Sequence, residues 1–319
     1  MARIPIAVVG VGSFGRNHAR VLAAMHEAEL VAVVDSNPGR AQALASEFNC
    51  RALSDHQELA GLVRAAVVAV PTTHHAEVGV ALLESGIDTL VEKPIAADLE
   101  SADSLISTAE QHGRILQVGH LERFNPIVEK IHEIAELPLF FEVHRMSQFA
   151  PRSLDVDVIL DLMIHDLDIV LSLVDSPLNR IEATGIPILS SNEDIASIRL
   201  VFENGCVANL TASRISVEKI RKLRFFQPRQ YISIDYTRQD GAVFYVDANS
   251  KIGFRPLGVE KGEPLARQLK SFLHSVETRE RPRVAGQDAR RVLDLALRIK
   301  KEMERHSTIV AATIGSRQT

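Results

Sequence analysis

The sequence has little of several residue types that mark other classes of protein. Its 319 residues include no tryptophan, only 5% aromatic residues and two cysteines, Cys50 and Cys206. Two cysteines are too few for a disulfide framework, and they lack the spacing of metal ligands. A reducing compartment, the cytoplasm, is therefore expected.

Long runs of one kind are also missing. No apolar stretch reaches the roughly 18 residues that a membrane-spanning helix needs. The N-terminal MARIPIAVVG lacks the apolar core and cleavage site of a signal peptide. The net charge is −5 without a basic run, which argues against nucleic acid or an anionic membrane as the main partner. The composition, 46% apolar and 24% charged, is that of a globular protein large enough for two domains.

The first part of the chain alternates short apolar runs with helical patterns. The apolar runs are 4–10, 30–35, 65–70, 88–93 and 114–119, and the helical patterns are 15–25, 38–48, 74–85 and 98–112. Continuous Val, Ile, Ala and Leu runs are typical of parallel strands buried on both faces. Repeated strand–helix units imply right-handed crossovers and a doubly wound parallel sheet.

After about residue 137 the runs alternate between apolar and polar residues, as in antiparallel strands with one covered face. The expected strands are 140–149, 196–202, 206–214, 222–226, 231–236 and 242–246, and the expected helices are 161–175, 263–278 and 286–305. Asn204–Gly205 indicates a hairpin between two of the strands. We expect an α/β domain over residues 1–122 and an α+β domain, with a large, mainly antiparallel open sheet, over residues 123–319.

A glycine motif lies between the first expected strand and the first helix. Gly10, Gly12 and Gly15 form G-x-G-x-x-G, and Asp35 follows twenty residues later at the end of the next strand. This context is typical of a turn that places a pyrophosphate at a helix N-terminus. An acidic residue at the second strand accepts hydrogen bonds from ribose hydroxyls and repels a 2′-phosphate. The motif predicts NAD rather than NADP, although Arg40 leaves NADP open.

Titratable side chains interrupt an apolar helical pattern in DLMIHDLD, residues 161–168. Spacings of four and three place Asp161, His165 and Asp168 on one face of an α-helix. Such groups against an apolar surface are either paired structural ions or a functional site. Lys93, in VEKPIA, ends the strand of residues 88–93, and open α/β sheets bind ligands at the carboxyl ends of their strands.

Together these motifs resemble the glucose-fructose oxidoreductase / inositol dehydrogenase / MocA (Gfo/Idh/MocA) family of nicotinamide-dependent dehydrogenases. The resemblance covers nearly the whole chain and rests on GVGSFGRNHA, VPTTHHAEVGVALLESG, EKPIA, QVGHLERFNP and DLMIHDLD. It implies an N-terminal Rossmann domain and an enzyme with Lys93, Asp161 and His165 as catalytic residues. The trailing Asp168 is expected to be structural or orienting.

The chemistry agrees with these roles. Removing a hydride from a secondary carbinol requires a base that takes the hydroxyl proton, a task to which histidine is suited near neutral pH. Lys93 would hydrogen-bond the same oxygen and stabilise the developing alkoxide charge. Asp161 would orient His165 or share its proton.

The resemblance also implies further ligand contacts. Cofactor contacts are expected at Ser13, Phe14, Pro71, Thr72, His75, Glu92 and Lys93, besides the three glycines and Asp35. Substrate contacts are expected at His120, Arg123, Asn125 and Arg152, with Arg145 as a weaker candidate. No metal is expected, because the adjacent His74 and His75 cannot easily share one ion on a helix.

Within the family, VGHLERFNP and DVDVILDLMIHDLDIVL most resemble the bacterial UDP-N-acetylglucosamine 3-dehydrogenases of lipid A biosynthesis. That resemblance implies NAD-dependent oxidation of the 3-hydroxyl to a ketone, which a partner aminotransferase consumes. RSLDVDVIL stands where many family members have a Gly-Gly-Gly run, so the substrate loop differs and a generic inositol or glucose dehydrogenase assignment becomes less secure. A dehydrogenase of a free cyclitol or sugar is one alternative reading. A noncatalytic NAD-dependent ligand sensor is another, against which the retained Lys93, Asp161 and His165 argue.

The large sheet expected in the second domain also predicts that the protein self-associates. Its sheet is large, and the few expected helices are too few to cover both faces. An exposed apolar sheet face usually binds a partner, so a homodimer or homotetramer is expected.

Overall fold

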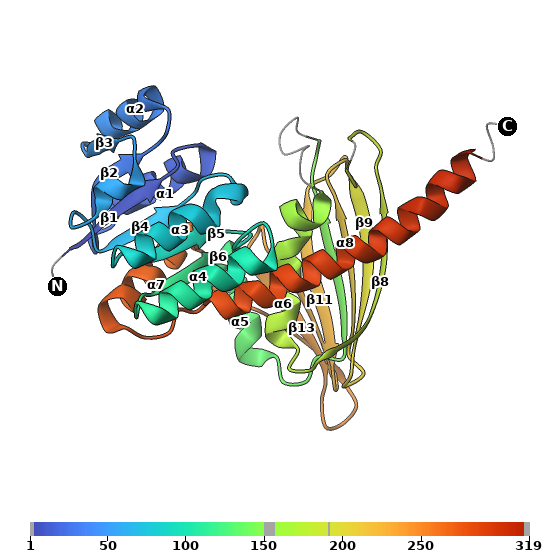
Figure 1. The fold of residues 1–319 in the computed structure, drawn as a ribbon. Helices are drawn as coiled ribbons and strands as arrows, with labels where there is room; N and C mark the ends of the chain where they lie inside the picture. The colour runs from blue at the N-terminus through green and yellow to red at the C-terminus, as the bar shows by residue number, and fades with distance from the viewer. Residues whose placement is uncertain (1–2, 150–156, 191, 316–319) are drawn as a thin grey trace. The chain divides into compact units, whose positions relative to one another are not determined.

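The computed structural model describes residues 3–149, 157–190 and 192–315 (Figure 1). The chain divides into two compact units: Met1–Phe124 with Gly262–Leu293, and Asn125–Lys261 with Asp294–Thr319. None of the described helices is long and apolar enough to cross a membrane.

The first unit is built on a six-stranded parallel sheet in the order β3-β2-β1-β4-β5-β6. Its strands are β1 (Ile4–Val9), β2 (Ala28–Val34), β3 (Arg51–Leu53), β4 (Ala65–Val68), β5 (Asp88–Glu92) and β6 (Leu116–Gly119). Its helices are α1 (Ser13–Ala24), α2 (Pro38–Phe48), α3 (His75–Glu84), α4 (Leu99–Gln111), α7 (Pro264–Thr278) and the start of α8 (Gly286–Gly315), with 3-10 turns η1 (His56–Leu59), η2 (Thr72–His74) and η3 (Leu121–Phe124). The doubly wound sheet is confirmed. Its strand order reverses between β1 and β4, so a ligand crevice is expected at their carboxyl ends.

The core of this unit explains why residues 262–293 belong to it. The apolar face of α7 contributes Leu269, Phe272 and Val276 to the same buried cluster as Ile6 and Val67 from the sheet. The boundary expected at 122/123 placed α7 in the second domain. An amphipathic pattern identifies the apolar face of a helix, but it does not identify the core against which that face packs.

The second unit contains an eight-stranded sheet in the order β14-β13-β12-β11-β7-β10-β9-β8. Its strands are β7 (Phe140–Met146), β8 (Leu178–Ile186), β9 (Ile195–Phe202), β10 (Val207–Ser213), β11 (Ile220–Gln227), β12 (Gln230–Asp235), β13 (Asp240–Val246) and β14 (Ile252–Pro256). Strands β7 and β10 pair in parallel and the other described pairs are antiparallel, as expected for a mainly antiparallel sheet. Helices α5 (Pro126–Ile134) and α6 (Ile164–Leu173) accompany it, with the π-helical turn η4 (Ile159–Met163).

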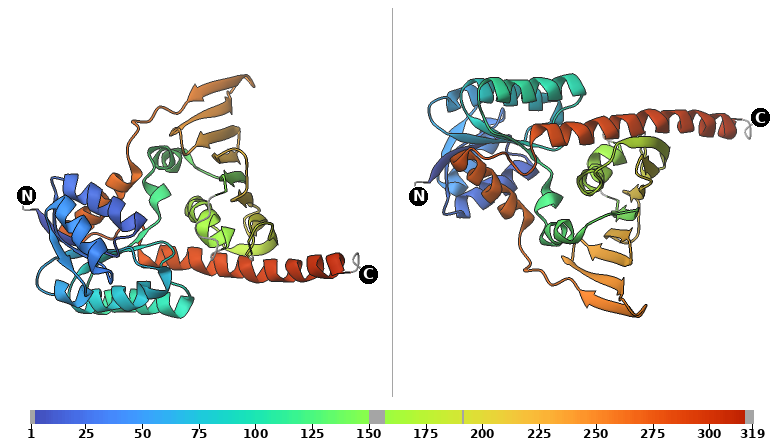
Figure 2. Two further views of the ribbon diagram at one scale, coloured as in Figure 1. Left: turned by 90° about the horizontal axis from the view of Figure 1, so that it is seen from above. Right: turned by 90° about the horizontal axis from the view of Figure 1, so that it is seen from below.

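The two faces of this sheet differ in character. Helices α5 and α6 lie on one side of it in both views of Figure 2. Alternate strand residues such as Phe141, Phe225 and Ile232 are fully buried. The opposite face carries an aromatic row, with neighbouring ring centroids 4.7–5.9 Å apart. The row consists of Phe140, Phe226, Tyr231, Phe244 and Phe254. Phe254 is 59% exposed, so at its β14 end the row faces solvent.

The structure departs from the expected elements at several positions, one of which is helix α5, where the sequence analysis predicted no element. The helix expected over 161–175 begins earlier, as η4, and becomes α-helical only at Ile164. Strands β3, β8 and β14 were missed because β3 has three residues and the other two expose most of their side chains, which weakens the apolar pattern. Helix α8 runs to Gly315, past the expected end at 305.

Candidate active site

The glycine turn is shaped by close backbone approaches at two of its three glycines. Gly10 has φ +86°, and a Cβ there would lie 2.7 Å from the backbone of Ala69 and Val70 at the end of β4. A Cβ on Gly15 would collide with the carbonyl oxygen of Gly10, so α1 could not pack against β1. Gly12 faces open space instead. Its lack of a side chain leaves room for a ligand at the N-terminus of α1, as a pyrophosphate requires.

Asp35 is fixed at the end of β2 by the same turn. Its Oδ2 accepts a hydrogen bond from Val11 N at 2.9 Å, and its Oδ1 accepts one from Asn37 N at 2.9 Å. These bonds hold the carboxylate at the rim of a cavity of about 570 Å³. Six of the expected cofactor residues line this cavity, namely Gly10, Gly12, Ser13, Phe14, Asp35 and Pro71. The size and the polar groups of the cavity fit a dinucleotide.

The cavity wall also holds residues that the sequence analysis did not assign to it. Ser36, Ser54 and His56 lie with Arg40 near Asp35, and His74 and Glu77 line the wall with Pro71. The histidine that lines the cavity here is therefore His74, and not His75 as expected. His75 is buried behind it, with Nε2 3.0 Å from Val70 O and Nδ1 2.9 Å from Pro94 O. Burial lowers the pKa of His75.

We expect Asp35→Ser to raise kcat/KM for NADP relative to NAD by at least about tenfold, because juxtaposed like charges cost several kcal/mol. Steady-state kinetics with both cofactors would measure this ratio. Asp98→Ser, which replaces an acidic cap on α4 outside the cavity, is the matched control. An unchanged ratio in Asp35→Ser would show that the carboxylate does not face the 2′ position.

Lys93 follows directly after β5, on a turn held by buried groups. Glu92 Oε2 accepts a hydrogen bond from Lys93 N at 3.2 Å, and Glu92 Oε1 lies 2.7 Å from His18 Nε2. Burial by itself raises the pKa of Glu92, but the interactions with His18 and Lys93 together outweigh this effect and leave the pKa lowered. An ionised carboxylate therefore lies beneath the lysine backbone.

In the second unit, Asp161 lies in η4 and His165 in the first turn of α6, and both side chains are partly exposed. Asp168 is fully buried, so it does not share their exposure as the ideal α-helical spacing suggested. The π-helical turn precedes His165, so it changes the spacing between Asp161 and His165 and not that between His165 and Asp168. Such turns are frequent at functional sites. Asp157 caps the start of this segment by accepting bonds from Ile159 N and Leu160 N, both at 3.0 Å.

A buried ion pair fixes α6 to the sheet. Arg145 on β7 contacts Asp166 through two hydrogen bonds of 2.6 and 2.9 Å, and both side chains are 2% exposed. The guanidinium also lies 5.3 Å from the centroid of the Tyr236 ring. This buried ion pair gives Arg145 a structural contact and weakens its case as a candidate for binding substrate. Its position on an alternating strand gave no sign of burial, because arginine on a strand is usually solvated.

A second anchor, the turn around Asp194, contacts the residue that precedes η4. The carboxylate of Asp194 accepts hydrogen bonds from Ile188 N and Ser190 N, at 2.7 and 3.0 Å, and from the Ser190 hydroxyl. Burial opposes ionisation, but the backbone donors from residues 188–190 prevail and lower the pKa of Asp194 to about 2. The preceding carbonyl, Glu193 O, accepts from Val158 N, so this turn supports the start of the helical segment.

This lowered pKa predicts a pH-dependent effect of Asp194→Asn. The depressed pKa contributes about 2 kcal/mol of stability above pH 4, and this contribution is lost as the pH falls towards 2. Asp194→Asn should therefore lower the free energy of unfolding at pH 7, and the difference from the wild type should shrink below pH 4. Urea denaturation across this range measures it, with the turn-capping Asp247→Asn as control. A pH-independent difference would contradict this prediction.

The expected substrate residues have varied environments. His120 is 1% exposed and Arg123 is half-buried. Asn125 caps α5 through Ile127 N and donates to Tyr236 O at 3.1 Å, so its amide serves the fold. Arg152 lies outside the described residues.

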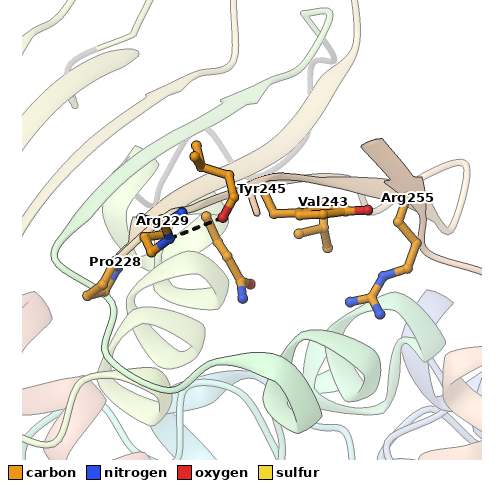
Figure 3. A pocket seen from close by; sticks show the side chains of 7 residues that line it. Pro228, Arg229, Val243, Tyr245 and Arg255 are labelled. Atoms are coloured by element: carbon orange, nitrogen blue, oxygen red, sulfur yellow. Dashed lines mark hydrogen bonds between the residues drawn. The ribbon is translucent and has the colours of Figure 1, made fainter. Parts of the chain in front are cut away.

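A second cavity, of about 410 Å³, lies on the sheet of the second unit (Figure 3). Val243 and Arg255 project from the same side of the sheet there, and Arg229 Nε donates to Val246 O at 3.1 Å. The Arg229 guanidinium also donates to Asp247 O, so this side chain is already hydrogen-bonded to backbone carbonyls. The cavity contains no carboxylate or histidine that could accept a proton, which makes it a poor candidate for catalysis.

Comparisons with known proteins match both parts of the chain. A family described as "Oxidoreductase family, NAD-binding Rossmann fold" matches residues 4–120, and the "GFO/IDH/MocA C-terminal domain" matches residues 138–232. A UDP-N-acetylglucosamine 3-dehydrogenase of Acidithiobacillus ferrooxidans is 33% identical over 310 residues, which are 95% of this chain and 98% of that protein. Its solved structure covers 96% of this chain and 99% of its own, with a TM-score of 0.90. A myo-inositol 2-dehydrogenase of Thermotoga maritima is 26% identical over 95% of this chain and 97% of its own.

Proposed function

Because the chain belongs to the Gfo/Idh/MocA family of NAD-binding oxidoreductases, we propose that it oxidises the 3-hydroxyl of UDP-N-acetylglucosamine to the 3-keto sugar. The observation that carries this choice of substrate is the 33% identity, over 95% of the chain, to a dehydrogenase of that name. The TM-score of 0.90 to the same enzyme supports it. The lined cavity and Asp35 supply the contacts that NAD needs.

We assign the proton chemistry to Lys93, Asp161 and His165. Bound NAD would supply the acceptor for the hydride of the carbinol carbon. His165 takes the hydroxyl proton as the C–O bond becomes a carbonyl, so the proton and the electron pair are both accounted for. Lys93 donates a hydrogen bond to the same oxygen and stabilises its developing negative charge. Asp161 orients the His165 ring.

A nucleotide sugar also brings a diphosphate, for which arginine is the suitable partner. Since Arg145 is buried against Asp166, the remaining candidates are Arg123 and Arg152. His120 and Asn125 stay secondary candidates for the substrate, because both are almost fully buried.

A free cyclitol is the second candidate substrate. The observation that favours it is the 26% identity to a myo-inositol 2-dehydrogenase over 95% of the chain. A noncatalytic NAD-dependent sensor is the third reading, and the presence of Lys93, Asp161 and His165 argues against it.

The growth of NADH absorbance with purified protein, NAD and UDP-N-acetylglucosamine tests the proposal. An aminotransferase with glutamate removes the ketone and draws the unfavourable equilibrium forward. NADH growth that disappears in Lys93→Met would support both the substrate and the site. If NADH binds but UDP-N-acetylglucosamine gives no turnover, the substrate assignment fails and myo-inositol is tested next. Binding of sugars without turnover of any would favour the sensor.

We also propose that the protein is cytoplasmic and forms a homodimer or homotetramer through the aromatic row. Contiguous exposed apolar surface is unusual on a monomer. Phe244 and Phe254 are 38% and 59% exposed, and Ile252 beside them is 81% exposed. Light scattering should give at least twice the monomer mass, and Phe244→Glu should reduce it. A wild-type monomer at working concentration would refute this proposal.

A further inference from the structure

A buried histidine on the phosphate-binding helix has no role in the chemistry described above. His18 lies on α1 and is 1% exposed. Its Nε2 is 2.7 Å from Oε1 of Glu92, which belongs to the end of β5. A carboxylate only accepts hydrogen bonds, so His18 Nε2 carries the hydrogen and donates it. This contact joins two segments that are 74 residues apart in the chain.

The carboxylate of Glu92 has little freedom to move. Its other oxygen accepts from Lys93 N at 3.2 Å. On the neighbouring strand β6, Gly119 pairs with Glu92, and a Cβ there would come within 2.9–3.0 Å of the three carboxylate atoms. The carboxylate is therefore confined between the backbone of β6 and the ring of His18. The hydrogen bond that this carboxylate accepts from Lys93 N therefore restrains the lysine backbone.

The next peptide of the turn is fixed from the other side. Pro94 O lies 2.9 Å from Nδ1 of His75, which is also buried. Glu92 thus contacts the backbone nitrogen of Lys93, and His75 contacts the carbonyl oxygen of the next residue, Pro94. A side chain that must reach a reacting oxygen benefits from such a rigid base, because a displacement of about 1 Å can cost 100-fold in rate.

We propose that His18 is a positioning residue for Lys93: by donating to Glu92 it fixes the carboxylate that holds the lysine backbone. This inference rests on the proposed role of Lys93 in catalysis. The same helix presents its N-terminus to the cofactor cavity, so the pair also ties the lysine turn to the element that binds the pyrophosphate.

His18→Leu removes the donor and retains an apolar side chain of similar size. We expect kcat to fall at least about tenfold, whereas the dissociation constant for NADH stays within about threefold. His18→Gln can place an amide nitrogen near the position of Nε2 and should recover most of kcat. Arg20→Gln, on the exposed side of α1 and paired with Glu263, is the matched control and should match the wild type.

A second measurement does not depend on turnover. Acylation of lysine amines by a small reagent, followed by peptide mass spectrometry, reports how each lysine is held. The Lys93 labelling rate should rise at least about threefold in His18→Leu, and that of the exposed Lys270 should not change. If His18→Leu fails to fold, Glu92→Gln replaces it, and a faster labelling of Lys93 is the expected result.

The outcomes separate this inference from the proposed function. An inactive Lys93→Met together with unchanged kcat and unchanged Lys93 labelling in His18→Leu would overturn the inference alone. Parallel losses of kcat and NADH affinity, without recovery in His18→Gln, would show a merely structural role and also overturn it. Full activity in Lys93→Met would overturn both, because the lysine would then have no role for His18 to support.

Discussion

His165→Ala is expected to lower kcat with the sugar substrate by about 100- to 10,000-fold, the usual range for the loss of a positioned general base. The hydroxyl proton would then lose its proposed acceptor, so the hydride would leave much more slowly. NADH affinity should stay within about threefold, because the cavity that fits the dinucleotide is lined by residues of the first unit only.

The kinetics and the binding of NADH are measured separately, by stopped-flow absorbance and by fluorescence titration. His274→Ala, which removes an exposed histidine from α7, is the matched control and should keep wild-type activity. The kcat of Asp161→Asn should lie between those of His165→Ala and His274→Ala, since this variant leaves the base in place but weakens its orientation. Retained turnover in His165→Ala, or an equal loss of turnover and NADH affinity, would remove His165 from the mechanism.

The parts of the fold that the sequence revealed are those with strong local patterns. The buried parallel strands β1 and β4 are continuous apolar runs, because both of their faces are covered. The Asn204–Gly205 hairpin follows from local backbone preference, and Gly205 has φ +85°. The glycine motif is local only in part: a Cβ on Gly15 would meet Gly10 O, whereas the steric demand at Gly10 comes from Ala69 and Val70, which are distant in the chain.

The anchors of the site depend on distant residues and could not be derived in this way. The pair of Arg145 and Asp166 joins a strand to a helix 21 residues later, and each residue alone looks like a solvated surface group. His18 and Glu92 are separated still further. The π-helical turn around Asp161 shifts the helical register, and no local propensity marks it. Long-range pairing, rather than local pattern, therefore decides how the proposed catalytic segment is held.

Arg145→Met should be the most destabilising of the substitutions considered, at about 3–5 kcal/mol of unfolding free energy, because it leaves the buried Asp166 carboxylate without its partner. Arg224→Met breaks a partly exposed pair with Glu142 on the other face of the sheet, where about 0–1 kcal/mol is expected. Urea denaturation of both variants, compared with the wild type, measures the two differences. Equal effects would show that the Arg145 pair is solvated in solution.

The double variant Arg145→Met/Asp166→Leu distinguishes a missing partner from a missing interaction. Removing both charges leaves no isolated ion in the core, so much of the lost stability should return. Its activity should nevertheless stay low if the ion pair, through its directional hydrogen bonds, sets the orientation of α6 and hence of His165. Stability that returns together with full activity would mean that apolar packing alone orients this helix, and stability that does not return would mean that the pair itself stabilises the fold.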